Sequence, residues 1–136
     1  MKVVEWFDKN RFKASSFSNI RKLVQLKKKQ KFTISVVIPT LNEELTIGKI
    51  VEVIKENLMQ KYQLVDEIVV IDSGSTDKTR EIAKKAGANV YIDSEILKRK
   101  GNYQGKGENL WKSLYVTKGS IICWIDGDIK NIHSRF

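Results

Sequence analysis

Apolar residues follow two alternating patterns along this chain, short continuous runs and longer segments in which they recur every three or four residues. The continuous runs are rich in Val and Ile, which is typical of strands, and the first, second and fourth are apolar enough to predict burial. The predicted strands are Thr33–Pro39, Asp66–Ile71, Asn89–Ile92 and Ser120–Ile125.

The segments between these strands have the spacing of amphipathic helices. Ile47, Ile50, Val51, Ile54 and Leu58 form an apolar stripe in the first of them. The predicted helices are Glu43–Tyr62, Asp77–Ala86 and Gly107–Thr117, and the polar, glycine-bearing segment Ser94–Lys106 is a predicted loop. Strands that alternate with helices favour parallel pairing with right-handed crossovers, so the chain is predicted to be a Rossmann-like α/β domain with a mainly parallel sheet.

Basic residues are concentrated near the N-terminus. The 136 residues carry a formal net charge of +9, and Met1–Lys31, with ten Lys and Arg against two acids, accounts for +8 of it. We therefore predict a basic helical segment at 1–31 and a separate α/β domain at 32–136. Such a segment could meet anionic lipid or nucleic acid, but no nucleic-acid-binding motif accompanies it, and a solvated helical arm is the preferred interpretation.

The apolar stretches are shorter than the roughly 18 to 20 residues that a membrane span needs. The N-terminus also lacks a secretory apolar region, because charges interrupt it. Cys123 is the one cysteine, so no intrachain disulfide can form, and its apolar neighbours predict a buried, unreactive thiol. These features predict a soluble cytoplasmic protein without a nucleic-acid partner.

The first candidate site is Asp126-Gly127-Asp128, directly after the last predicted strand. In a parallel α/β sheet, ligands bind outside the carboxyl ends of the strands. Two carboxylates one residue apart can converge on Mg²⁺ or Mn²⁺, which prefer oxygen ligands and also bind substrate phosphates. Gly127 would let a ligand approach the backbone, although Asp-Gly is also a common turn. His133 could approach the metal, but a surface role is the preferred interpretation.

Two further candidate turns follow the first and second strands. Glu43, in the turn after Pro39, can accept hydrogen bonds from a ribose or uracil, whereas Asn42 beside it can cap the next helix. Asp72 and Ser73 follow the second strand and are predicted to face the crevice between the strand ends, where a nucleoside would bind.

A lysine between two glycines marks the fourth candidate site. Lys106 lies between Gly105 and Gly107 at the start of a predicted helix, where backbone amides and one cation suit a phosphate. The spacing of a P-loop is absent, and a flexible surface lysine is the alternative interpretation.

In this order, the four sites resemble family 2-type glycosyltransferases with the GT-A fold. The strings VVIPTLNEE and VDEIVVIDSGSTDKT and the aspartates of WIDGD are common to many GT-A transferases. GKGENLW, with EWFDKNRFKASSF near the N-terminus, is similar to glucosyl-3-phosphoglycerate synthases and their mannosyl relatives. The resemblance covers the donor-binding part of such enzymes, so the GT-A nucleotide-sugar-binding fold is expected to be truncated at its C-terminus.

Carried over by position, the resemblance implies a donor site and a metal site. The expected donor-binding residues are Pro39, Thr40, Leu41, Glu43, Asp72, Ser73, Lys106 and Asp126. The expected ligands of Mg²⁺ or Mn²⁺ are Asp126 and Asp128, with Asp128 the more direct. Gly127 departs from the family, which often has Ser there, and Ile132 stands where a proline is common. The catalytic and acceptor-binding positions are expected beyond Phe136.

The resemblance implies metal-dependent transfer of glucose from UDP-glucose, or another nucleotide sugar, to 3-phosphoglycerate with retained anomeric configuration. A homodimer is compatible with this interpretation. Two alternatives stay open. A polyprenyl-phosphate sugar transferase would place the basic N-terminal segment at a membrane. A catalytically incomplete nucleotide-sugar-binding fragment would bind UDP without turnover.

Overall fold

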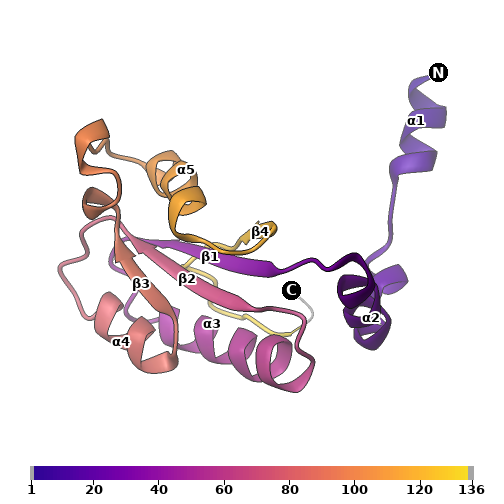
Figure 1. Ribbon diagram of the computed structural model, residues 1–136, viewed down its shortest axis with the longest axis horizontal. Coiled ribbons are helices and arrows are strands. Elements are labelled where there is room, and N and C mark those ends of the chain that lie inside the picture. Colours follow the sequence, from indigo (N-terminus) through magenta and orange to yellow (C-terminus); the bar gives the residue numbers. More distant parts are fainter. Residues whose placement is uncertain (1, 135–136) are drawn as a thin grey trace.

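A parallel sheet of four strands in the order β3-β2-β1-β4 organises the protein, whose computed structural model describes residues 2–134 (Figure 1). Each strand boundary lies within one residue of its predicted position, and every pairing is parallel as expected. The strands are β1 (Ile34–Thr40), β2 (Glu67–Asp72), β3 (Asn89–Ile92) and β4 (Ile121–Trp124).

Helices cover both faces of this sheet, so the predicted α/β class is confirmed. Two helices, α3 and α4, pack on one face, and α5 lies on the other (Figure 1). The helices after β1 are α3 (Ile47–Ile54), the π-helix η2 (Lys55–Lys61), α4 (Thr79–Ala86), the 3₁₀ helices η3 (Asp93–Glu95) and η4 (Lys98–Lys100), and α5 (Lys106–Val116). The predicted loop Ser94–Lys106 therefore contains short helical turns.

The first predicted helix was placed too early. It was expected from Glu43, but α3 begins at Ile47, because Asn42 adopts a left-handed backbone with φ of 58°. The amide of Glu43 donates to Thr79 Oγ1 at 2.7 Å, which ties this residue to the next loop, while its carbonyl accepts from the amide of Ile47 at 3.0 Å in a separate turn before α3. Beyond Ile54 the helix widens into η2, which no feature of the apolar spacing indicated.

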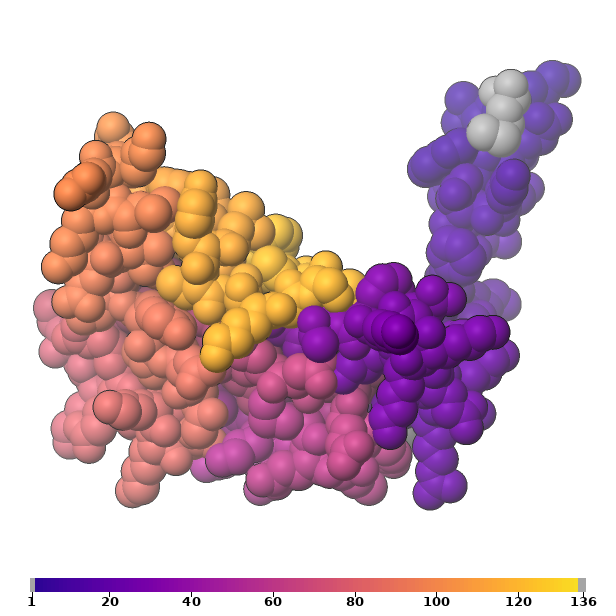
Figure 2. All heavy atoms as spheres, in the orientation of Figure 1, coloured from indigo at the N-terminus to yellow at the C-terminus, as the bar shows by residue number. Residues whose placement is uncertain are grey.

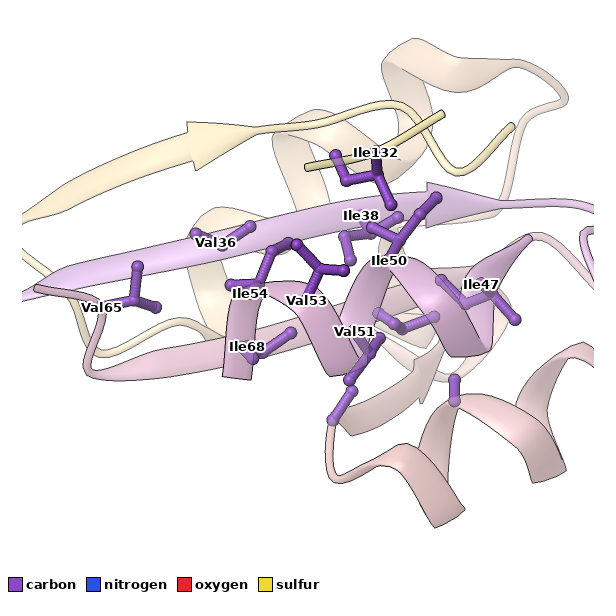
Figure 3. Packing of buried hydrophobic residues seen from close by; sticks show 13 residues of the cluster. Val36, Ile38, Ile47, Ile50, Val51, Val53, Ile54, Val65, Ile68 and Ile132 are labelled. Carbon is purple, nitrogen blue, oxygen red and sulfur yellow. The ribbon is translucent and has the colours of Figure 1, made fainter. Parts of the chain in front are cut away.

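The main core lies between the sheet and the pair α3 and α4 (Figure 3). Alternate residues of β1 serve different clusters: Val36 and Ile38 face α3, whereas Val37 packs with Val69 and Ile71 on the face of α5. The central strands β1 and β2 are thus buried on both faces, as their continuous apolar runs predicted.

The prediction that the last strand and its cysteine are buried is wrong. Ile121, Cys123 and Trp124 of β4 are exposed, because β4 is an edge strand that pairs with β1 alone. The indole N–H of Trp124 donates to Ser113 Oγ of α5 at 3.1 Å, so α5 covers part of one side of this strand.

The basic N-terminal segment is helical and stands largely apart from the sheet. It comprises α1 (Val3–Asn10), the 3₁₀ helix η1 (Ala14–Phe17) and α2 (Ile20–Gln30), and none of them has a buried residue. α1 projects away from the sheet, as Figures 1 and 2 show, while Lys27 of α2 pairs with Asp66 at 2.6 Å just before β2. Within residues 2–134, no helix has the length and apolar character to cross a membrane. The boundary between residues 31 and 32 stays a prediction.

Truncation of a central core side chain should destabilise the fold strongly. Ile38 is fully buried, so Ile38→Ala should lower the free energy of unfolding by about 2 to 5 kcal/mol, through lost burial and a residual cavity. Leu45→Ala is the matched control, because Leu45 is 92% exposed and its loss should change stability by about 0.5 kcal/mol or less. Urea unfolding measures both, and equal losses would contradict this packing.

Candidate functional site

A pocket of about 720 Å³ opens at the carboxyl ends of the strands, where the sequence placed the candidate site. It is formed by the turns after β1, β2 and β4, together with the segment before α5. Eight of the nine predicted site residues line it: Pro39, Thr40, Leu41, Glu43, Ser73, Lys106, Asp126 and Asp128.

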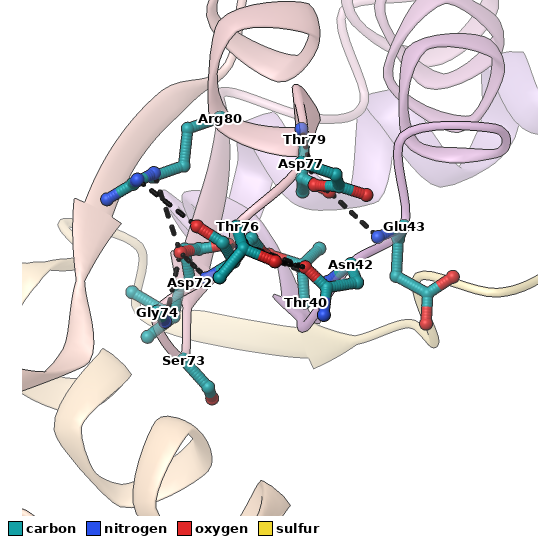
Figure 4. Close-up of polar contacts among 12 residues, drawn as sticks. Thr40, Asn42, Glu43, Asp72, Ser73, Gly74, Thr76, Asp77, Thr79 and Arg80 are labelled. Atoms are coloured by element: carbon teal, nitrogen blue, oxygen red, sulfur yellow. Dashed lines mark hydrogen bonds and ion pairs between the residues drawn. The ribbon is translucent and has the colours of Figure 1, made fainter.

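The first wall is held by hydrogen bonds between the turns after β1 and β2 (Figure 4). The amide of Asn42 donates to Ser75 Oγ at 2.8 Å, and the amide of Thr76 donates to Asn42 Oδ1 at 2.9 Å. Asn42 therefore binds the neighbouring turn and does not cap α3 with its side chain. Because both turns are fixed to one another, the pocket has a rigid wall although it is made of loops.

Glu43 presents its carboxylate on this wall. Its backbone amide is bound to Thr79, while its side chain points away from the network (Figure 4). Thr46 Oγ1 approaches this carboxylate at a long distance of 3.4 Å. The carboxylate thus lines the pocket, and its predicted role as an acceptor for a nucleoside stays a prediction.

Asp72 differs from expectation, because its side chain does not face the pocket. It is fully buried, and its Oδ2 accepts from the amides of Gly74 at 3.0 Å and Ser75 at 2.8 Å. Its Oδ1 accepts from the hydroxyl groups of Ser75 and Thr40, and the guanidinium of Arg80 lies 3.7 Å from Oδ2. Asp72 therefore shapes the turn from beneath, while its neighbour Ser73 reaches the pocket.

The aspartate turn after β4 forms a second wall. Asp126 and Asp128 are exposed in the pocket, and Asp126 is paired with the ammonium of Lys106 across it. Gly127 is buried between them, and a Cβ added there would lie 3.0 Å from the carbonyl oxygen of Pro39. The close approach that requires glycine is therefore to the protein's own strand end. The carbonyl of Gly127 also accepts from Thr46 Oγ1 at 2.6 Å.

These aspartates supply two carboxylates for a metal ion. Among the described residues, no three His, Cys, Asp or Glu side chains are gathered closely enough to hold a metal. His133 is exposed and forms no such group with Asp126 and Asp128. A divalent ion held here would need its other ligands from outside these side chains.

Several lining residues were not singled out from the sequence. Asp93 directly follows β3, so the rule that ligands bind at strand ends would have found it. The others lie in the predicted glycine-bearing loop before α5, in which the sequence assigned a donor-binding role to Lys106 but not to these side chains. These additional lining residues are Asp93, Asn102, Tyr103 and Gln104. Asn109, in the quoted GKGENLW string, also lines the pocket; its Nδ2 donates to the carbonyl of Ile71 at 2.9 Å, and its Oδ1 accepts from Ser73 at 3.0 Å.

A buried ion pair lies beneath the segment before α5. Lys112 Nζ is 2.9 Å from Glu108 Oε1, and both side chains are almost inaccessible to solvent. The bond from the Lys112 ammonium, followed by the hydrogen bond from the indole of Trp111, holds the pKa of Glu108 below its ordinary value of 4.5. Glu108 is thus charged over the whole neutral range.

This sheet, with its nucleotide-sized pocket at the strand ends, defines the protein as an α/β domain of the GT-A glycosyltransferase fold. The family model described as "Glycosyl transferase family 2" matches residues 35–131, and the chain belongs to this family. The match includes β2, β3, β4, all of β1 except Ile34, and every predicted site residue.

The relatives narrow the resemblance in the way that the sequence motifs indicated. The chain is 57% identical over 128 residues to glucosyl-3-phosphoglycerate synthase of Petrotoga mobilis, over 94% of this chain and 39% of that protein. It matches the crystal structure of mannosyl-3-phosphoglycerate synthase from Rubrobacter xylanophilus with a TM-score of 0.92 and 32% identity, over 98% of this chain and 42% of that one.

Crystal structures of glucosyl-3-phosphoglycerate synthase from Mycobacterium tuberculosis match with a TM-score of 0.76 and 43% identity, over 85% of this chain and 39% of those chains. One of them is a complex with Mg²⁺ and uridine diphosphate, and another contains Mn²⁺, UDP-glucose and phosphoglyceric acid. The chain thus spans about two fifths of the length of these relatives, as the 39% and 42% coverage shows.

The lowered pKa of Glu108 predicts a contribution to acid stability. With a folded-state pKa below the unfolded value of 4.5, its stabilisation is fully present above that value and is lost as the pH falls through the folded pKa. Glu108→Gln removes this titration. The free energy of unfolding of the variant should therefore fall less steeply than that of the wild type between about pH 5 and about pH 3. Thermal unfolding across this range measures the slope, and exposed Glu95→Gln is the control. Parallel acid limbs for wild type and Glu108→Gln would contradict the assignment.

Proposed function

We propose that this chain binds a uridine-diphosphate sugar together with Mg²⁺ or Mn²⁺, as the donor site of a hexosyltransferase that acts on 3-phosphoglycerate. The observation that carries the donor site is the charge of the pocket. Four carboxylates, of Glu43, Asp93, Asp126 and Asp128, line it against the single ammonium of Lys106 among the described residues. A diphosphate would be repelled by this excess of acids unless a divalent cation accompanies it.

The aspartates fit such an ion. Asp126 and Asp128 would hold it, and phosphate oxygens and water would complete its ligands, since Mg²⁺ commonly binds through one or two carboxylates plus substrate phosphates. When bound, the ion neutralises charge on the diphosphate leaving group. Lys106, which pairs with Asp126 in the structure, lies where its ammonium can bind a phosphate oxygen of the same donor.

The first wall suits the nucleoside. Glu43 offers a carboxylate to ribose or uracil donors, and the wall formed by Pro39, Thr40 and Leu41 beside it is fixed by the hydrogen-bonded turns. Ser73, whose Oγ donates to Asn109 Oδ1, lines the pocket from the turn after β2 and can contact the base or ribose. The complexes of the Mycobacterium tuberculosis enzyme with uridine diphosphate and with UDP-glucose support a uridine nucleotide here.

The proposed transfer to 3-phosphoglycerate is supported by the names of the relatives, whereas retained configuration is an implication of the family resemblance alone. The Petrotoga mobilis and Rubrobacter xylanophilus proteins are both named as synthases of hexosyl-3-phosphoglycerates. This similarity favours the phosphoglycerate acceptor over a polyprenyl phosphate. The acceptor has a phosphate and a carboxylate, and Lys106 is the one cation among the described lining residues, so recognition of the acceptor needs further cationic groups.

Donor binding should depend on the divalent ion. UDP should bind in the presence of Mn²⁺ or Mg²⁺, and EDTA should weaken this binding at least tenfold, about 1.4 kcal/mol, because four carboxylates then face the diphosphate. Asp128→Asn should weaken binding in Mn²⁺ by a similar factor. Titration calorimetry measures both. Asp8→Asn, with the same charge change in α1, is the control, and unchanged affinity in EDTA would refute the proposed metal site.

The transfer reaction gives a separate test. With UDP-glucose, Mn²⁺ and 3-phosphoglycerate, we expect the 136 residues alone to turn over far below about 1 per second, since Lys106 is the one cation that the described lining residues offer to two anionic substrates. The Petrotoga mobilis synthase serves as the positive control. In NMR spectra, the product of this control should show the same anomeric configuration as the glucose of the donor. Turnover near the control's rate would show that the 136 residues already contain the acceptor site.

A further inference from the structure

Lys112 is the largest fully buried side chain among the described residues. It lies in the middle of α5, one helical turn after Glu108, with which it forms the ion pair of 2.9 Å. A lysine ammonium is rarely buried without full pairing, because removing its charge from water is costly. The other contacts of the Lys112 ammonium therefore show which part of the chain the buried pair supports.

Those contacts all go to one segment of the chain. The ammonium donates to the carbonyl of Asp93 at 2.9 Å, to the carbonyl of Gly101 at 3.1 Å and to Asn102 Oδ1 at 2.7 Å. Glu108 lies beside the same segment, since the backbone amide of Tyr103 is among the groups that lower the pKa of its carboxylate. The two side chains thus lie together at the base of one pocket wall.

The other side-chain contacts given for this wall are a long hydrogen bond from Asn102 Nδ2 to Asp93 Oδ1 at 3.4 Å and the exposed pair of Lys106 with Asp126. Its residues 101–106 are exposed, and the glycines near its two ends, Gly101 and Gly105, have left-handed backbones with φ of 82° and 125°. Glycine at such positions permits many backbone conformations, so the shape of the segment must be imposed by contacts from elsewhere. Asn102, Tyr103 and Lys106 between and beside these glycines line the pocket.

We propose that Glu108 and Lys112 are positioning residues: their buried pair beneath α5 holds the segment Asn102–Lys106 in the shape that lines the donor pocket. This proposal rests on the proposed function only where it concerns nucleotide affinity. An apolar pair of the same volume could stabilise α5 equally well, since buried ion pairs are often replaceable without loss of stability. Only the ammonium, however, can donate to the oxygens of Asp93, Gly101 and Asn102 together.

That difference separates positioning from stability in an experiment. Lys112→Met should free the segment, and hydrogen exchange of amides 101–106 without nucleotide should be at least about tenfold faster. UDP affinity with Mn²⁺ should fall about 10- to 100-fold, the usual effect of losing a group that supports a binding residue. The double variant Lys112→Met/Glu108→Gln no longer buries an unpaired charge, so it should regain thermal stability while exchange stays fast and UDP binding stays weak.

Two further variants keep the test decisive. Lys27→Met is the matched control, because Lys27 is also a largely buried lysine, bonded to Asp66 at 2.6 Å and to the carbonyl of Gln63 at 3.0 Å, remote from the pocket. It should leave exchange at 101–106 unchanged. Asn102→Ala, on the exposed segment, removes one acceptor of Lys112 and should speed this exchange even if Lys112→Met does not fold.

Each outcome bears on one claim. Wild-type exchange at 101–106 in a folded Lys112→Met protein, or equal acceleration by Lys27→Met, would overturn the positioning role. Wild-type UDP affinity in the double variant would overturn its link to donor binding. If the unaltered chain does not bind UDP with Mn²⁺, the proposed function fails, and the exchange measurements still decide whether the pair positions the segment.

Discussion

The site depends on the parallel pairing of β1 with both of its neighbours. In the register of the sheet, Thr40 at the end of β1 lies opposite Asp72 at the end of β2, and Val37 lies opposite Trp124 at the end of β4. Because the strands run in one direction, their carboxyl ends emerge at one edge, and the turns that follow them must share that edge. Antiparallel pairing of the same segments would have separated the aspartate turn from Glu43.

Polar groups beneath the pocket then convert these turns into fixed walls. Asp72 is buried with its oxygens bonded to the turn after β2, and Asn42 joins that turn to the one after β1. Lys112 has the same relation to the wall before α5. Buried polar groups of this kind are costly unless fully bonded, and when bonded they specify a single geometry. The residues that shape the pocket are therefore different from those that face it.

Charged side chains distinguish one wall of the pocket from the other. The exposed carboxylates of Asp126 and Asp128 lie beside Lys106, whose ammonium already pairs with Asp126. An exposed pair of this type contributes little to stability, so its partners can exchange for other ions at little cost. A rigid wall of apolar and polar groups thus adjoins an exchangeable charged wall, and these are the surfaces to which the proposed function assigns the nucleoside and the metal-bound diphosphate.

The sequence by itself determined the strands, the parallel α/β class and eight of the lining residues. Continuous apolar runs such as Val36–Ile38 can only be buried on both faces, and the residues after such strands must meet at the sheet edge. It could not determine the start of α3, because hydrogen bonds from Asn42 and Glu43 to a turn some thirty residues later override the local helical spacing.

Tertiary structure also decided which of the candidate side chains face the pocket. Asp72 and Ser73 are equivalent as neighbours in a sequence, yet the turn buries the first and leaves the second in the pocket. Cys123 is exposed because β4 lies at the edge of the sheet, a position that an apolar run does not reveal. Nothing in the helical spacing marks Lys112 as a buried residue. It is buried because the segment before α5 packs over it. Burial is a property of the assembled layers, whereas periodicity reports only the local segment.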